Sequence, residues 1–266
     1  MRLALIGVMV VMGTTFVSTL FTTMVRVYEQ QRRPPLRLVA MSALIREWMA
    51  LNWAVVSTPL AVVPNRPRPP IGPVQLPPVI LVPGYGLNRM MFVLLAAYLR
   101  RRGRWVWAIN NPVVRDDVRA FAAHLKGRVA KMLEVSGAEQ VDLVGHSMGG
   151  VVSAWYIHHL DRAGSVRRLV TLGTPWRGTK MHIFGFGRQS HELAPGSDVL
   201  EGLPAQLGVP VTAIWSDIDV IVLPTQNATP IHGRAVEVDR VGHVEMPLNP
   251  KVMRAVHAAL SEETQA

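Results

Sequence analysis

The stretch 141–150, Val-Asp-Leu-Val-Gly-His-Ser-Met-Gly-Gly, constrains the fold more than any other part of this sequence. Its apolar start predicts a strand that ends at Gly145, and the apolar residues 151–157 that follow predict a helix. Ser147 therefore stands in a tight strand-to-helix turn between glycines, which is the setting of a nucleophile elbow. Such a turn lifts the serine hydroxyl above the sheet and directs the first amides of the helix toward it. We expect Ser147 to be a catalytic nucleophile.

Apolar segments of strand length alternate with helical patterns over the rest of the chain. We expect strands at residues 79–82, 105–109, 141–144, 166–172, 209–215 and 235–241, and helices at residues 89–102, 115–135, 151–157 and 249–260. The longest of these helices has an apolar face made of Val118, Phe121, Ala122, Leu125, Val129 and Leu133. Strands that alternate with helices form βαβ units. The sequence therefore predicts an α/β fold with a mostly parallel central sheet flanked by helices.

A serine nucleophile needs a histidine base and a carboxylate that orients the histidine. In this kind of sheet the acid and then the base follow the serine, each in a loop after a strand. Asp217 and Asp219 both follow the fifth expected strand, and spacing alone leaves either open as the acid. His243 follows the sixth expected strand and is the predicted base. Asp198 and His232 follow no expected strand and rank below these residues.

Three other histidines lie near the serine in sequence. His146 precedes Ser147 but faces down the turn, where it cannot reach the serine Oγ. His158 and His159 invite a metal-binding interpretation. Adjacent helical side chains diverge by about 100°, so one ion cannot take both. The sequence predicts surface histidines there and no metal site.

An oxyanion hole in such a site uses the amide of the residue after the nucleophile, which is Met148 here. Its second amide comes from the loop after the first strand. That loop reads Pro-Gly-Tyr-Gly-Leu-Asn, and its glycines permit a tight approach. We expect the backbone N–H of Tyr85 to be the second donor.

The N-terminal segment is apolar. Residues 3–25 carry no charge, and as a helix they are long enough to cross a bilayer, although hydroxyl side chains dilute the second half. A cleaved signal peptide is the alternative, but no small-x-small cleavage site follows residues 3–12. We expect a retained anchor in a bacterial inner membrane, with the side that the catalytic domain faces left open.

A second uncharged stretch, residues 48–63, is short for a membrane span and contains Pro59. It either crosses the membrane or lies as a helix on the membrane or on the domain. The proline-dense residues 64–77 predict a semi-rigid linker. The expected organisation is membrane and juxtamembrane helices at 1–63, this linker, and a catalytic domain at 78–266.

The charge distribution argues for lipid and against nucleic acid as a partner. Of the net charge of +10, residues 1–77 supply +6, from eight arginines and two glutamates. This charge lies beside the apolar segment, where anionic lipid head groups are the natural partner. The chain has no cysteine, which excludes disulfides, a thiol nucleophile and thiolate metal sites.

Five motifs together resemble the bacterial lipase and esterase branch of the α/β-hydrolase family, from about residue 78 to the C-terminus. They are Leu-Val-Pro-Gly-Tyr-Gly at 81–86, Val-Gly-His-Ser-Met-Gly-Gly at 144–150, Thr-Leu-Gly-Thr-Pro at 171–175, Ser-x-x-Asp-x-x-Val-x-Pro at 216–224 and Val-Gly-His at 241–243. The resemblance places the acid on Asp219 and implies hydrolysis of carboxylic esters of lipids or other acyl esters, without metal or cofactor. Pro83 departs from the family, which usually has histidine there.

The same machinery is compatible with two other activities, acyl transfer and thioester hydrolysis, and a catalytically silent membrane scaffold is a further alternative. Residues 176–203 form a long segment between two expected strands. Segments placed in this way often cover an active site. We expect either a mobile apolar lid or a fixed excursion of the chain.

Overall fold

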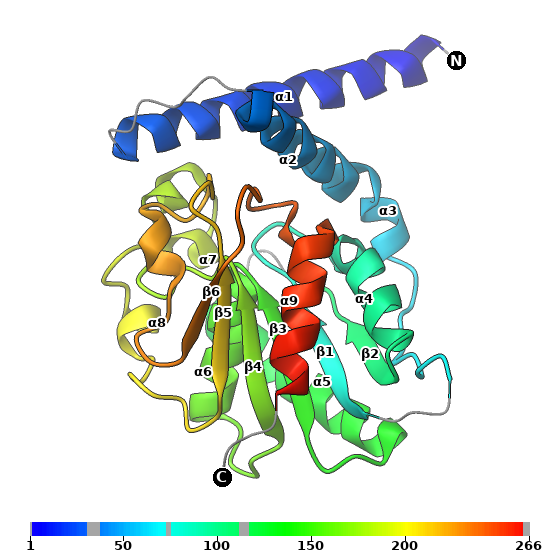
Figure 1. Cartoon of the computed structure of the whole chain (residues 1–266). Helices are drawn as coiled ribbons and strands as arrows, with labels where there is room; N and C mark the ends of the chain where they lie inside the picture. Colours follow the sequence, from blue (N-terminus) through cyan, green and yellow to red (C-terminus); the bar gives the residue numbers. More distant parts are fainter. Residues whose placement is uncertain (1, 31–37, 73–75, 112–116, 263–266) are drawn as a thin grey trace.

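The computed structural model describes residues 2–30, 38–72, 76–111 and 117–262. Within these ranges, the side chains of residues 2–9, 27, 29–30 and 38–40 are outside the description. An α/β domain forms the body of the molecule, and two long N-terminal helices lie across one end of it (Figure 1).

The described residues form one parallel sheet of six strands in the order β2-β1-β3-β4-β5-β6. The strands are β1 (Leu76–Val82), β2 (Arg104–Ala108), β3 (Val141–His146), β4 (Val166–Leu172), β5 (Val211–Trp215) and β6 (Arg234–Glu237). The predicted α/β fold with a parallel central sheet is confirmed.

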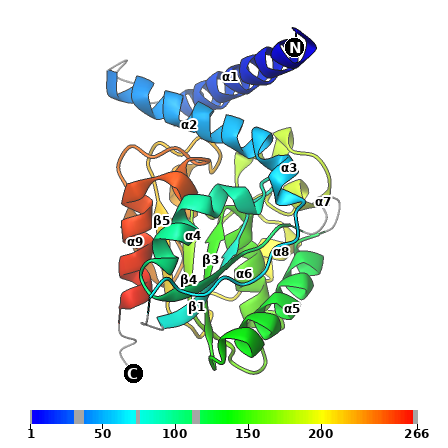
Figure 2. The same cartoon turned by 90° about the vertical axis from the view of Figure 1, so that its right-hand side faces the viewer.

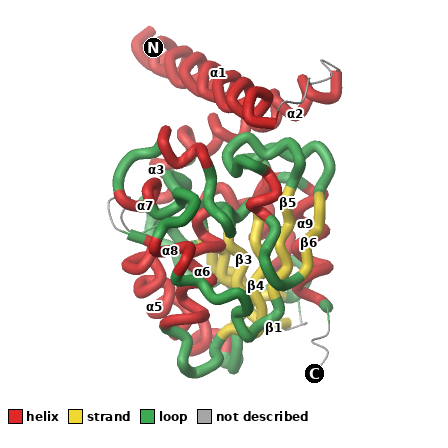
Figure 3. Tube along the Cα trace, turned by 90° about the vertical axis from the view of Figure 1, so that its left-hand side faces the viewer, coloured by secondary structure: helices red, strands yellow, loops and turns green. Residues whose placement is uncertain are grey.

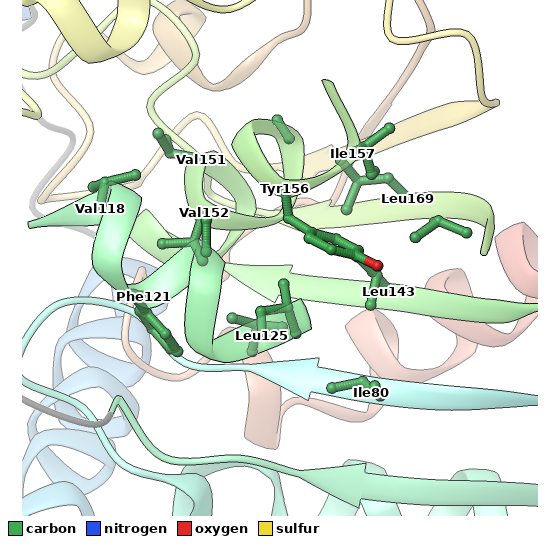
Figure 4. Packing of buried hydrophobic residues seen from close by; sticks show 14 of the residues in the cluster. Ile80, Val118, Phe121, Leu125, Leu143, Val151, Val152, Tyr156, Ile157 and Leu169 are labelled. Atoms are coloured by element: carbon green, nitrogen blue, oxygen red, sulfur yellow. The ribbon is translucent and has the colours of Figure 1, made fainter. Parts of the chain in front are cut away.

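Helices cover both faces of this sheet (Figures 1 and 2). The elements of the domain are η1 (Arg89–Phe92), α4 (Val93–Arg100), α5 (Val118–Ser136), α6 (Met148–His159), η2 (Lys180–Phe184), α7 (Arg188–His191), α8 (Asp198–Glu201), η3 (Thr225–Ala228), η4 (Met246–Leu248) and α9 (Pro250–Ser261). Helices α5 and α6 pack on one face, where Ile80 and Leu143 point (Figure 4). Helices α4 and α9 pack on the other, where Val79 and Leu81 point. The inner strands β1, β3, β4 and β5 are therefore largely buried on both sides, as their continuous apolar runs predict, whereas the residues of the edge strand β6 are mostly exposed.

Helix α5 shows how local sequence sets an element. The Asp117 side chain caps its start by accepting from Ala120 N at 2.7 Å, and Gly137, at φ 68°, ends it. The predicted apolar face is buried at Val118, Phe121, Ala122, Leu125 and Val129, with Leu133 partly buried. Residue 115, where the helix was expected to begin, lies outside the described residues.

Several element boundaries differ from the expected ones, among them the end of β6 and the start of β1. Strand β6 stops at Glu237 because its neighbour β5 ends at Trp215, which pairs with Glu237. Strand β1 begins at Leu76, inside the expected linker. The linker also forms an antiparallel bridge between Arg68 and Val106, so this part of it packs on the domain.

The N-terminal helices are α1 (Arg2–Gln30), α2 (Leu38–Val56) and α3 (Thr58–Ala61). Helix α2 packs Ala50 and Ala54 against Met91 and Val244 of the domain. Helix α1 crosses above α2 (Figures 1 and 3). The expected stretch 48–63 is therefore divided between two helices, and its first part lies on the domain.

In the described part of the chain, no helix combines the length and the apolar character needed to cross a membrane. The predicted membrane span at residues 3–25 is not supported. The second half of this segment carries a run of hydroxyl side chains. In the structure these hydroxyls bond back to helix carbonyls, as Thr19 Oγ1 does to Thr15 O at 2.8 Å and Thr23 Oγ1 to Thr19 O at 2.8 Å.

Candidate active site

Ser147 forms the turn between β3 and α6 in a conformation that L-residues rarely adopt, with φ 54° and ψ −126°. The surrounding backbone leaves no room for side chains. A Cβ on Gly145 would lie 2.5 Å from Gly150 N, and a Cβ on Gly149 would collide with the Val82 carbonyl of β1. The two glycines permit the turn, and the strained serine is the signature of a nucleophile elbow.

The structure brings Asp219 and His243 together. The Nδ1 atom of His243 lies 2.7 Å from Asp219 Oδ2, and both side chains are buried. The other carboxylate oxygen of Asp219 accepts from the amides of Ile221 and Val222, at 2.8 Å each. Asp217, the alternative acid, forms no such pair: its backbone carbonyl accepts from Arg26 Nη2 of α1 at 3.1 Å.

The end of β4 connects this pair to the serine. Ser147 N donates to Leu172 O at 2.8 Å. A Cβ on the next residue, Gly173, would lie 3.0 Å from Asp219 Oδ2 and 3.1 Å from His243 Nδ1. The serine turn and the His–Asp pair are thus close neighbours at the carboxyl end of the sheet.

His146 makes a second connection, which the sequence did not reveal. Its Nε2 atom lies 2.9 Å from the backbone carbonyl of His243, and the two rings are 4.9 Å apart. Burial, with the nearby charge of His243, lowers the pKa of His146 to about 3. His146 is therefore a neutral brace for the His243 loop, and it faces that loop rather than the serine hydroxyl.

The electrostatic surroundings of His243 favour its charged form. Burial alone would lower the pKa of this imidazole, but the charge and hydrogen bond of Asp219 and the charge of Glu47 raise it above the ordinary value. A base of this kind takes a proton readily from a hydroxyl group.

The predicted oxyanion donors lie on either side of the serine. Met148 is the first residue of α6, where helical N–H groups have no partner within the helix. The loop of Tyr85 approaches from β1, because a Cβ on Gly84 would lie 2.8 Å from Ser147 Cβ. In the described part of the chain, no backbone hydrogen bond joins either amide to a carbonyl of another element, and their role as oxyanion donors stays a prediction.

The segment 176–203 carries η2, α7 and α8 and is packed against the domain along much of its length, with Gln189 buried. Tyr85 ties its outer part to the expected oxyanion loop: its hydroxyl donates to Phe186 O at 2.6 Å and accepts from Phe186 N at 2.8 Å. The Phe184 and Phe186 rings are exposed. The packed part of residues 176–203 agrees with a fixed excursion of the chain. Mobility of the outer part, around Phe184 and Phe186, stays a prediction.

Two further features lie outside the serine turn. In the part of the chain that the structure describes, no three side chains of metal-binding type converge. His158 and His159 are exposed, and His159 Nε2 lies 3.1 Å from Gly202 O.

An apolar cavity of about 650 Å³ lies between α1, α2 and α4. Trp53 and Glu245 line this cavity, but Ser147 does not.

Known proteins share this architecture. Residues 77–209, half of the chain, match the family model described as the alpha/beta hydrolase fold. The protein belongs to the α/β-hydrolase fold family.

Solved structures with the same fold include three whose sequences are far from this one. The mature lipase BlEst2 of Bacillus licheniformis has a TM-score of 0.63 and 17% identity, covering 72% of this chain and 96% of that chain. The carboxylesterase CesB of Bacillus subtilis has a TM-score of 0.51 and 16% identity, and the match covers 84% of this chain and 100% of that chain. A membrane phospholipase A, described as a bacterial virulence factor, has a TM-score of 0.53 and 18% identity, and the match covers 84% of this chain and 94% of that chain. At these identities the likeness is one of fold.

Proposed function

We propose that this protein is a serine hydrolase that cleaves carboxylic esters of lipids or other acyl esters. The observation that carries the proposal is the buried hydrogen bond between His243 and Asp219 beside the strained Ser147. Nucleophile, acid and base follow one another in the chain order of the α/β-hydrolase fold, each after a strand of the same parallel sheet.

In this mechanism Ser147 Oγ attacks the ester carbonyl while His243 takes the hydroxyl proton. Asp219 holds the imidazole in the required tautomer and stabilises its charge. The amides of Met148 and Tyr85 bind the oxyanion of the tetrahedral intermediate. The C–O bond then breaks, His243 returns its proton to the leaving alcohol, and an acyl-enzyme remains. Water, deprotonated by His243, then attacks the acyl carbon, the bond to Ser147 Oγ breaks, and His243 returns the proton to this oxygen as the acid leaves.

The neighbours support the ester class, since their names describe a lipase, a carboxylesterase and a phospholipase A. An acyltransferase or a thioesterase would use the same residues. Product analysis with an added alcohol distinguishes hydrolysis from acyl transfer. A comparison of the oxygen ester and the thioester of the same acyl group distinguishes an esterase from a thioesterase.

We also place the protein on a membrane surface, that of the bacterial inner membrane, through its N-terminal helices. Helices α1 to α3 expose many large apolar side chains: Val10, Met12, Phe16, Val17, Leu20, Phe21, Met24, Tyr28, Met41, Ile45, Met49, Val55, Val56 and Leu60. The net positive charge of residues 1–77 complements anionic head groups. Sedimentation with phosphatidylglycerol vesicles should exceed that with phosphatidylcholine, and a protein that sediments with neither overturns this placement.

Labelling with a fluorophosphonate probe tests the serine hydrolase. Wild type should label and Ser147→Ala should not, and wild type alone should hydrolyse nitrophenyl esters of short and long acids. If folded wild type takes up no probe, the hydrolase proposal fails, and a silent scaffold becomes the better interpretation.

A further inference from the structure

Glu47 lies on the side of α2 that faces the loop of His243, and it is only 5% exposed. Both of its carboxylate oxygens bind that loop: Oε1 accepts from Val244 N at 2.8 Å and Oε2 from Glu245 N at 3.0 Å. A Cβ on Gly242 would collide with Oε2. One carboxylate from an N-terminal helix therefore touches the backbone on both sides of His243.

The loop 238–245 has no strand to hold it, because it lies between the end of β6 and the start of η4. Helix α2 binds it at a second point. Arg46 Nε lies 2.9 Å from Glu245 Oε2, and Arg46 Nη2 donates to Arg240 O at 2.7 Å. Consequently, the docking of α2 helps to determine where the imidazole of His243 lies.

The position of Glu47 also matters for charge. The ionisable groups that face His243 are Asp219 after β5, His146 on β3 and Glu47 on α2. Burial raises the pKa of Glu47 to about 7, against the opposing effects of the Val244 amide and the His243 charge. The negative charge of Glu47 in turn favours the protonated imidazole.

We propose that Glu47 is a positioning residue for His243. It fixes the loop that carries the imidazole and adds a second negative charge, beside that of Asp219, that stabilises the imidazolium formed during catalysis. This inference rests on the proposed serine hydrolase. Glu47 lies outside residues 77–209 that match the family model, so the N-terminal region contributes to the catalytic centre of this chain.

The test is the pH profile of kcat/KM for a soluble nitrophenyl ester. Glu47→Gln should lower the plateau on the order of 10- to 100-fold, as misplaced catalytic groups do. Its acid limb should move to lower pH by roughly half a unit, because a nearby negative charge is lost. Glu47→Asp keeps the charge and should keep the acid limb at the wild-type pH. Arg46→Met loosens the same loop without removing the charge of Glu47. The plateau of kcat/KM in this variant should therefore fall, while the acid limb of its pH profile should stay at the wild-type pH.

Thermal unfolding verifies that each variant is folded. An unmoved acid limb in Glu47→Gln, with or without a lower plateau, overturns the proposal, since a purely structural contact predicts that result. If Glu47→Gln does not fold, Gly242→Ala replaces it, because the new Cβ displaces the carboxylate and should move the limb in the same direction. Fluorophosphonate labelling separates the two proposals: an unlabelled wild type overturns the hydrolase, whereas a labelled wild type with unmoved limbs overturns only the role of Glu47.

Discussion

Phe21 of α1 meets Phe184 of η2 edge to face, with ring centroids 5.1 Å apart and an interplanar angle of 87°. Arg26, on the same helix, donates to the backbone carbonyl of Asp217, two residues before Asp219. Helix α1 therefore contacts both the expected lid segment and the loop of the expected catalytic acid. The N-terminal helices cover the end of the sheet where the proposed site lies (Figures 1 and 3).

The first prediction concerns this aromatic contact. Phe21→Ala should increase hydrogen exchange of the amides in residues 180–186 roughly two- to tenfold, because an aromatic pair contributes about 0.5–1.5 kcal/mol. Phe16→Ala is the matched control, since the Phe16 ring contacts Trp48 within the N-terminal helices, at 5.8 Å. Equal exchange in the two variants would contradict a specific contact between α1 and the segment.

The second prediction concerns the strain at Ser147. Its φ of 54° is accessible to glycine but costly for L-residues. Ser147→Gly should therefore have a free energy of unfolding about 1 kcal/mol higher than Ser147→Ala, measured by urea denaturation. At Ser57, with φ −81° and ψ −7°, the order should be reversed, because glycine is the weaker residue in a helical conformation. If Ser147→Ala were as stable as Ser147→Gly, or more stable, the serine turn would store no strain.

The third prediction separates the two aspartates. Asp219→Asn should lower kcat by about 10⁴-fold, as loss of the orienting carboxylate does in serine triads. The acid limb of kcat/KM should also move to lower pH, because Asp219 raises the pKa of His243 and the base must be neutral to act. Asp217→Asn should leave both quantities near the wild-type values. A larger loss of kcat in Asp217→Asn than in Asp219→Asn would show that Asp217, and not Asp219, is the acid.

The sequence predicted what depends on local pattern. The positions of the strands along the chain, the turn at Ser147 and the loop positions of Asp219 and His243 follow from periodicity, glycine placement and chain order. The proximity of His243 to Asp219 follows because β5 and β6 are neighbouring parallel strands. Their pairing agrees with the predicted roles, which labelling and kinetics still have to test.

What the sequence did not reveal depends on contacts between distant segments. Glu47 stands in an apolar helix, and nothing in its neighbourhood indicates that it binds the amides of Val244 and Glu245. The end of β6 was misplaced because the apolar pattern continues after the pairing with β5 has ended. The predicted membrane span at residues 3–25 is not supported by the helices of the described residues.

The last prediction is the effect of pH on stability through Glu47. The pKa of this carboxyl is raised in the folded protein, from 4.5 to about 7, so the folded state binds a proton more tightly than the unfolded state does. Its contribution to stability is therefore fully present below about pH 4.5 and is lost as the pH rises to about 7. Relative to Glu47→Gln, whose amide does not titrate, the wild type should lose about 3 kcal/mol of unfolding free energy over this interval. Urea denaturation of both proteins at pH 4.5, 5.5, 6.5 and 7.5 measures the difference. If the difference in unfolding free energy between the two proteins does not change with pH, Glu47 is not a buried carboxyl with a raised pKa.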